Sequence, residues 1–189
     1  VPFTCKIAAS RGHLDVVMWL RENGCSWNES VCAGAAETGQ LEVLKWLREN
    51  GCEWDEDTCT KAAEGGHLEL LIWARENECP WNENACSEAA AKGHLEVLKW
   101  ARENGCPWDA FEISYYAAIK GHLEMLKWAI QNGGVWNRQI CAEAKGWKSF
   151  DILKWAEEAG LSMDGLSDKS VFEEIEEIQE VEEAEALEF

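Results

Sequence analysis

Apolar residues recur along the chain in blocks of about 27 residues, and each block repeats one pattern. Tryptophan marks the pattern in two series, and glycine in a third that keeps the same register: Trp19, Trp46, Trp73, Trp100, Trp128 and Trp155; Trp27, Trp54, Trp81, Trp108 and Trp136; Gly12, Gly39, Gly66, Gly93 and Gly121. One extra residue enters between Trp108 and Ala117. Three series of residues in one register identify an internal repeat.

Each block predicts two short helices. The first carries small residues such as Cys59, Ala62 and Ala63 at i, i+3 and i+4, which give it one narrow apolar face. The second, LEVLKWLRE in one block, spreads its apolar residues over a wide arc and ends at Asn50-Gly51. Second helices are expected to begin near residues 14, 41, 68, 95, 123 and 150, and no period-2 pattern predicts a strand.

Polar residues that favour helix N-caps precede the first helices, at Asn28, Asp55, Asn82, Asp109 and Asn137. One helix pair cannot bury its own apolar face, so neighbouring pairs must cover it. We therefore expect an all-α helix-turn-helix solenoid over residues 1–160, with units beginning near 1, 28, 55, 82, 109 and 137.

Residues 161–189 are predicted to form an acidic C-terminal segment. Val171, Ile175, Ile178 and Val181 recur there at helical spacing, which favours a helix that caps the stack. A disordered acidic tail fits the same composition. The two alternatives stay open.

The helix pairs resemble the ankyrin repeat, whose pattern is AAxxGHxxVVxxLLxxGA. Ala89-Ala90, Gly93-His94, Val97-Leu98 and Gly105-Cys106 fall on its characteristic positions. The usual unit has six more residues, which build a β-hairpin finger, so the resemblance implies about six ankyrin-like repeats with shortened or absent fingers. It also implies that the turn histidines bond to backbone between repeats.

The charge balance narrows the classes of partner. The chain has 17 basic and 36 acidic residues and a formal net charge of -19, which disfavours nucleic acid and favours a basic protein partner. The sequence shows neither a signal-peptide pattern nor an apolar run long enough to span a membrane. We expect a monomer that does not bind membranes, located in the cytoplasm or nucleus.

The nine cysteines fall into two series that follow the repeat, one in the first helices and one after the second helices. No Cys-x-x-Cys or His-x-x-x-His spacing occurs, and equivalent residues in stacked layers would lie about 10 Å apart, too far for a shared metal or a disulfide. We therefore expect reduced thiols in the core, no metal site and no cofactor. The tryptophans are also expected in the core, as spacers between layers.

The fifth block departs from the others and supplies the candidate partner site. Phe111, Tyr115 and Ile119 lie at i, i+4 and i+8 of a first helix, beside Tyr116. One layer earlier the same places hold Glu83, Ser87 and Ala91, which suit solvent, so the stripe is expected to be exposed. Clustered exposed aromatic residues are typical of binding hot spots. Packing against the irregular sixth block, at Gly146 and Trp147, is the alternative.

These features predict a non-catalytic protein-interaction scaffold that binds its partner through the first-helix face. Phe111, Tyr115, Tyr116 and Ile119 would supply binding energy, and three acidic residues would supply charge selectivity: Glu56, Glu64 and Glu83. A structural spacer within a larger protein, with no partner of its own, is the alternative function. No enzyme is expected, because the carboxylates recur with the repeat and no single constellation stands out.

Overall fold

The computed structural model describes residues 2–161, which form twelve α-helices and no strand. The predicted acidic segment lies outside the described residues, apart from Leu161. The chain divides into two compact units, Val1–Asp109 and Ala110–Phe189, which are treated separately below. The expected all-α architecture without β-hairpin fingers is confirmed for the described residues.

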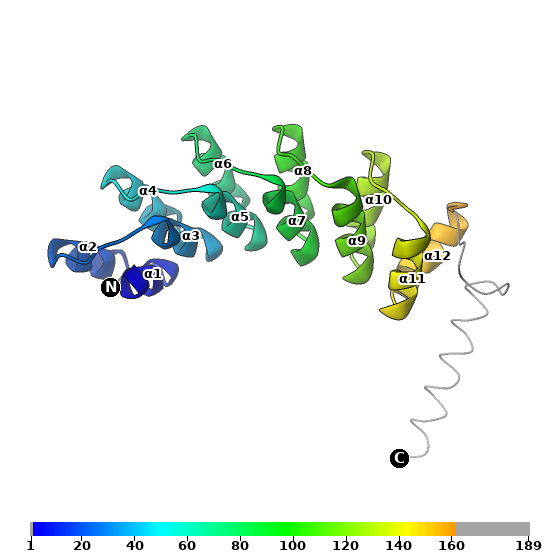
Figure 1. The fold of residues 1–189 in the computed structure, drawn as a ribbon, viewed down its shortest axis with the longest axis horizontal. Coiled ribbons are helices and arrows are strands. Elements are labelled where there is room, and N and C mark those ends of the chain that lie inside the picture. Colours follow the sequence, from blue (N-terminus) through cyan, green and yellow to red (C-terminus); the bar gives the residue numbers. More distant parts are fainter. Residues whose placement is uncertain (1, 162–189) are drawn as a thin grey trace, which may run out of the picture. The chain divides into compact units, whose positions relative to one another are not determined.

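Unit 1 contains four helix pairs (Figure 1). Its first helices are α1 (Pro2–Ser10), α3 (Glu29–Glu37), α5 (Glu56–Glu64) and α7 (Glu83–Lys92), and its second helices are α2 (Leu14–Glu22), α4 (Leu41–Glu49), α6 (Leu68–Glu76) and α8 (Leu95–Glu103). Unit 2 contains two pairs: α9 (Ala110–Ile119) with α10 (Leu123–Gln131), and α11 (Arg138–Gly146) with α12 (Phe150–Glu158). The second helices begin at the predicted positions.

Local polar contacts fix where these helices start and stop. The side chains of Asp55, Asn82 and Asn137 each accept a backbone N–H from the first turn of the helix that follows, which satisfies a donor that the helix itself leaves open. At the other end of the second helices, Asn50 Nδ2 donates to the carbonyl oxygen of Trp46 at 2.8 Å. Gly51 follows in the left-handed conformation that ends the helix.

The core of unit 1 lies between the layers and within each pair. First helices pack side by side, α1 on α3, α3 on α5 and α5 on α7, through buried small residues such as Cys59, Ala62 and Ala63 (Figure 1). The effect of a neighbouring layer shows at one repeated position. Val16, in the first pair, is 40% exposed, whereas Val43 one layer on is only 3% exposed. Each layer therefore removes part of the next layer's second helix from water.

The turn between the two helices of a pair bonds to the layer before it. His67 Nε2 lies 3.2 Å from the carbonyl oxygen of Glu37, and His94 Nε2 lies 3.0 Å from that of Glu64. In the second pair Gln40 replaces the histidine, and the Thr38 hydroxyl donates instead to the carbonyl oxygen of Ser10 at 2.6 Å. The expectation that the turn histidines bond backbone between repeats is confirmed for His67 and His94.

The prediction that the tryptophans form the core is wrong. Trp19 and Trp147 are exposed and the other ten are half-buried. They lie instead at the surface beside the second helices, where Trp54 packs edge-on against Trp73 with ring centroids 5.8 Å apart. The Arg48 guanidinium of the preceding layer lies 4.1 Å from the centroid of Trp54. Tryptophan thus does link consecutive layers, through cation–π contacts at their edge.

Truncation of Leu71 tests whether the second helix carries the core. Leu71 is fully buried, so Leu71→Ala should lower the free energy of unfolding by about 2–5 kcal/mol through lost contacts and a cavity. Glu69→Ala, on the exposed side of the same helix, should change it by less than about 0.5 kcal/mol. Urea unfolding followed by circular dichroism measures both, and equal effects would contradict this core.

Alanine variants of two glycines distinguish the cost of a left-handed backbone from the cost of disturbing the packing of the turn. Gly51 and Gly66 both have positive φ, but a Cβ on Gly51 meets nothing within 4 Å, whereas one on Gly66 lies 2.6 Å from the His94 ring. Both alanine variants should lose about 1–2 kcal/mol to the backbone. Gly66→Ala should lose about 1 kcal/mol more, because His94 must give up its inter-layer bond.

Unfolding in urea gives the difference between these two glycine variants. In a His94→Ala background the extra loss at Gly66 should disappear. If it persists there, contact with the ring is not its cause.

Candidate functional site

The aromatic stripe predicted in the fifth pair lies on α9. Phe111 stacks on Tyr115 with ring centroids 5.7 Å apart, and Tyr115 meets Tyr116 edge-on at the same distance. All three side chains, and that of Ile119 at the end of the helix, are half-buried. The structure therefore brings Phe111, Tyr115 and Tyr116 together as one aromatic cluster that keeps part of its surface in water.

The inference that every position of the stripe faces solvent in the earlier layers is wrong at its centre. Thr60 and Ser87, which occupy the place of Tyr115, are only 8% and 7% exposed. Thr60 also donates to the carbonyl oxygen of Glu56 at 3.0 Å within its own helix. The outer position is exposed as expected, at both Glu56 and Glu83. Tyr115 thus lies at a position that is buried in the earlier layers. Because its ring is larger than the side chains of Thr60 and Ser87, it is only half-buried.

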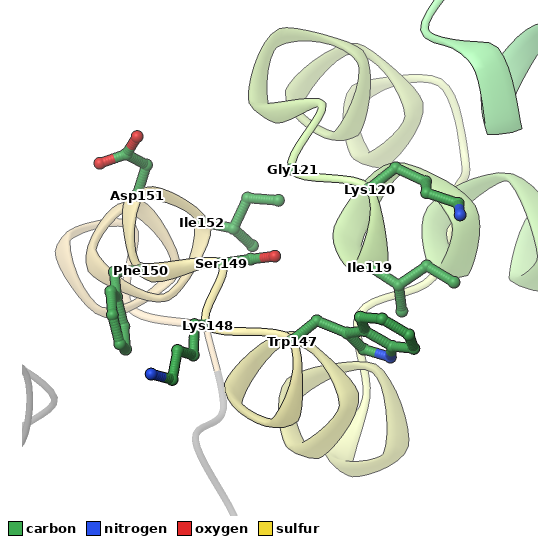
Figure 2. A pocket seen from close by; sticks show the side chains of 9 residues that line it. All are labelled: Ile119, Lys120, Gly121, Trp147, Lys148, Ser149, Phe150, Asp151 and Ile152. Atoms are coloured by element: carbon green, nitrogen blue, oxygen red, sulfur yellow. The ribbon is translucent and has the colours of Figure 1, made fainter.

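A hollow of about 430 Å³ lies at the end of the stripe, between the turns of the fifth and sixth pairs. Its wall includes Ile119 from α9, and Trp147 and Ser149 from the turn before α12 (Figure 2). In Figure 2 the Trp147 ring lies close to Ile119, and the Ser149 hydroxyl points into the open space between its own turn and the turn that carries Gly121. Trp147 remains 64% exposed, so the sixth pair borders the stripe without covering it.

The hollow exists because the turn of the sixth pair lacks the usual histidine. In unit 1 the turn histidine fills the space over the glycine of the preceding layer, as His67 does over Gly39. Ser149 stands at the histidine's place in the repeat. A Cβ on Gly121, the glycine it would cover, meets nothing within 4 Å. The exchange of histidine for serine is visible in the sequence, but the repeat pattern alone did not predict the hollow that results from it.

The three acidic candidates lie in unit 1 and differ in their surroundings. Glu56 and Glu83 are exposed at the first turns of α5 and α7. Glu64 instead pairs with Lys61 at 2.6 Å and with Lys92 at 3.1 Å. The hydrogen bond from Lys61 holds the pKa of the Glu64 carboxyl below its usual value. Glu56 and Glu83 are therefore available to an external cation, while Glu64 is already neutralised.

Other kinds of site find little support among residues 2–161. No group of three or more His, Cys, Asp or Glu side chains lies close enough to hold a metal ion. None of the described helices is long and apolar enough to cross a bilayer. The hollow beside Ile119 and Trp147 adjoins the aromatic cluster on α9, and this cluster departs from the repeat pattern of the described helices. The cluster and the hollow together form the candidate site.

Comparison with known proteins bears on fold and family. Residues 86–130 match the family model described as ankyrin repeats in many copies. Among solved structures, the chain is similar to the human ASB11 ankyrin repeat domain, with a TM-score of 0.70, 16% sequence identity, and coverage of 88% of this chain and 89% of that one. A search of curated proteins by sequence gives no match.

Ankyrin repeats generally mediate protein–protein interaction, and their fold is typically non-catalytic. The arrangement of the described helices agrees with the matched fold. Residues 86–130 thus match the ankyrin-repeat family model, and the described helices have the fold of an ankyrin repeat domain.

Proposed function

We propose that the protein is a non-catalytic scaffold that binds a protein partner through the first-helix face of its repeats. The observation that carries the proposal is the surface of unit 2 formed by Phe111, Tyr115, Tyr116 and Ile119 with the hollow beside Trp147. We propose further that the scaffold is a monomer located in the cytoplasm or nucleus, which fits nine cysteines of which none forms a disulfide.

The aromatic cluster has the physical properties of a binding hot spot. Its rings are held by one another and by α9, so little conformational entropy remains to be lost when a partner covers them. The hollow beside Ile119 is large enough to receive an apolar side chain of the partner, and Trp147 offers a further aromatic face there. Buried aromatic anchors in pockets dominate the energy of most interfaces.

Charge would select the partner and guide it to the scaffold. The chain carries a formal net charge of -19, and Glu56 and Glu83 keep exposed carboxylates at one position of successive first helices. A basic partner would be attracted over a distance of about 10 Å at ordinary salt, the range over which charges remain unscreened. Such charges act more on the rate of association than on affinity.

Loss of the aromatic cluster tests the proposed binding surface. Proteins captured from a lysate by the wild-type chain should be identified and their dissociation constants measured by calorimetry. Phe111→Ala/Tyr115→Ala should weaken the principal complex by about 2 kcal/mol or more, roughly 30-fold in Kd.

Trp19→Ala is the matched control, because it removes an exposed aromatic side chain from unit 1 and should leave Kd unchanged. Circular dichroism shows whether both variants fold. If the folded double variant keeps every partner, this surface is not the binding site. If the wild-type chain captures nothing specific, a spacer role replaces the scaffold.

Neutralisation of the exposed carboxylates tests the charge component. Glu56→Gln/Glu83→Gln should slow association with a basic partner several-fold at low salt and much less at high salt, since screening removes the attraction. Stopped-flow or surface-plasmon measurements give the rates. Glu64→Gln, whose carboxylate is already paired with Lys61 and Lys92, should have the smaller effect; a larger one would contradict this assignment.

A further inference from the structure

The two cysteine series meet inside each of the first four repeats. Equivalent cysteines of neighbouring layers are too far apart to bond, but two different cysteines of one layer are not. The Sγ atoms of Cys5, in α1, and Cys25, after α2, lie 2.7 Å apart. The same hydrogen-bonding contact between thiols recurs in the next three repeats, each time between residues 20 apart: Cys32 with Cys52, Cys59 with Cys79, and Cys86 with Cys106.

Each pair connects the first helix to the link that follows the second helix. All of these cysteines are fully buried except Cys25, which is half-buried. The link thiol also reaches a backbone carbonyl at the start of the same repeat: Cys52 Sγ lies 3.5 Å from the carbonyl oxygen of Asn28. The thiol is thus held in place while it faces its partner. Gly51 and Glu53 on either side of Cys52 are exposed, so the link itself runs along the surface.

Both cysteine positions differ in the fifth repeat. Ser114 stands at the helix position and Gly134 at the link position, so both cysteines have changed together. The Ser114 hydroxyl accepts the backbone N–H of Val135 at 2.9 Å and donates to the carbonyl oxygen of Ala110 at 3.0 Å. A Cβ on Gly134 would lie 2.7 Å from the Ser114 Oγ. The two positions are therefore in direct contact there as well.

We propose that these four pairs are sites of reversible disulfide formation, one bond within each of the first four repeats, with a small disulfide such as oxidised glutathione as the oxidant. In the Cys5–Cys25 pair, whose Sγ atoms lie 2.7 Å apart, a thiol must move by less than about 1 Å to reach the bond length of about 2.05 Å. The bond joins residues 20 apart and ties both helices of a repeat into one closed loop. No bond between layers is involved.

The reaction balances within two exchange steps. The link thiolate attacks one sulfur of the oxidised glutathione, forms a mixed disulfide and releases one glutathione thiolate, which takes up the proton that the link thiol lost. The helix thiol then loses its proton and attacks the protein sulfur of the mixed disulfide, and the second glutathione leaves and is protonated. Two protein thiols are oxidised, and one disulfide is reduced to two thiols.

The surroundings of the link thiol favour it as the first nucleophile in the first, second and fourth repeats, whereas in the third the hydrogen bond with Cys59 raises the pKa of the link thiol Cys79. The hydrogen bond from Cys32 lowers the pKa of Cys52, and the Arg48 guanidinium acts in the same direction. The same hydrogen bond raises the pKa of the Cys32 thiol. Cys106 is affected as Cys52 is, with its pKa lowered mainly by the hydrogen bond from Cys86. A thiolate is the reactive form.

Mass spectrometry of the full chain tests the proposal. The reduced, folded protein is incubated with oxidised glutathione, its remaining thiols are blocked, and it is digested without reduction after lysine, arginine and glutamate, which places each cysteine on its own peptide. Four disulfides, each between cysteines 20 apart, should form, and one thiol of the nine should remain. The oxidised protein should also unfold at a higher temperature than the reduced one.

A matched variant copies the chain's own alternative. Cys32→Ser/Cys52→Gly places the residues of the fifth repeat in the second, where Glu53 retains a backbone N–H for the serine hydroxyl. This variant should form three bonds and gain less thermal stability on oxidation, whereas Cys141→Ser should still form four. Bonds at other spacings, cross-links between chains, or a folded chain that keeps all its thiols under the oxidant would overturn the proposal.

Discussion

The burial of each layer by its neighbour is the constraint on which the rest of the structure depends. The same valine position is 40% exposed at Val16 and 3% exposed at Val43, and the difference is supplied by the layer before. A fully buried valine or leucine contributes about 1.5–3 kcal/mol, so several such positions decide whether a pair of nine- or ten-residue helices is stable. Helices this short do not persist alone in water. Side chains that face a neighbour are therefore constrained, while those on the open side of a first helix can change, as at Phe111.

A second set of contacts sets how far apart the layers stand, and the candidate site arises where it is interrupted. His67 and His94 fill the space over a preceding glycine and bond to a backbone carbonyl. Serine is too short to do either, so at Ser149 the turn keeps its place in the repeat while the space stays open beside Ile119. The hollow thus follows from a single shortened side chain in an otherwise regular turn. A repeat protein can gain a site in this way without disturbing the helices that support it.

Sequence periodicity predicted the fold almost completely and the contacts within a layer poorly. The 27-residue spacing placed every second helix, and the Gly-His turn placed the inter-layer bonds. A period shows which residues are equivalent, but it does not show which residues of one layer touch, because that depends on how two helices and a link close in space. The Cys5–Cys25 contact was missed for this reason. The tryptophans were misplaced because hydrophobicity was equated with burial. Small residues such as Ala62 let the first helices pack closely, so the core has no space for large rings and these lie at its edge.

The proposed binding surface and the proposed disulfides involve different residues of the repeats. The proposed binding surface on α9 would use partly exposed side chains of a first helix, whereas the cysteine pairs of unit 1 are buried, apart from the half-buried Cys25. Closing such a pair shortens the free loop of its own repeat, so its effect on the unfolded chain is confined to that loop. Since neighbouring layers share their stability through burial, a repeat stabilised from within also stabilises the layers beside it. The proposed oxidation of a buried pair would therefore raise the stability of unit 1 without adding or removing an exposed side chain in the first helices.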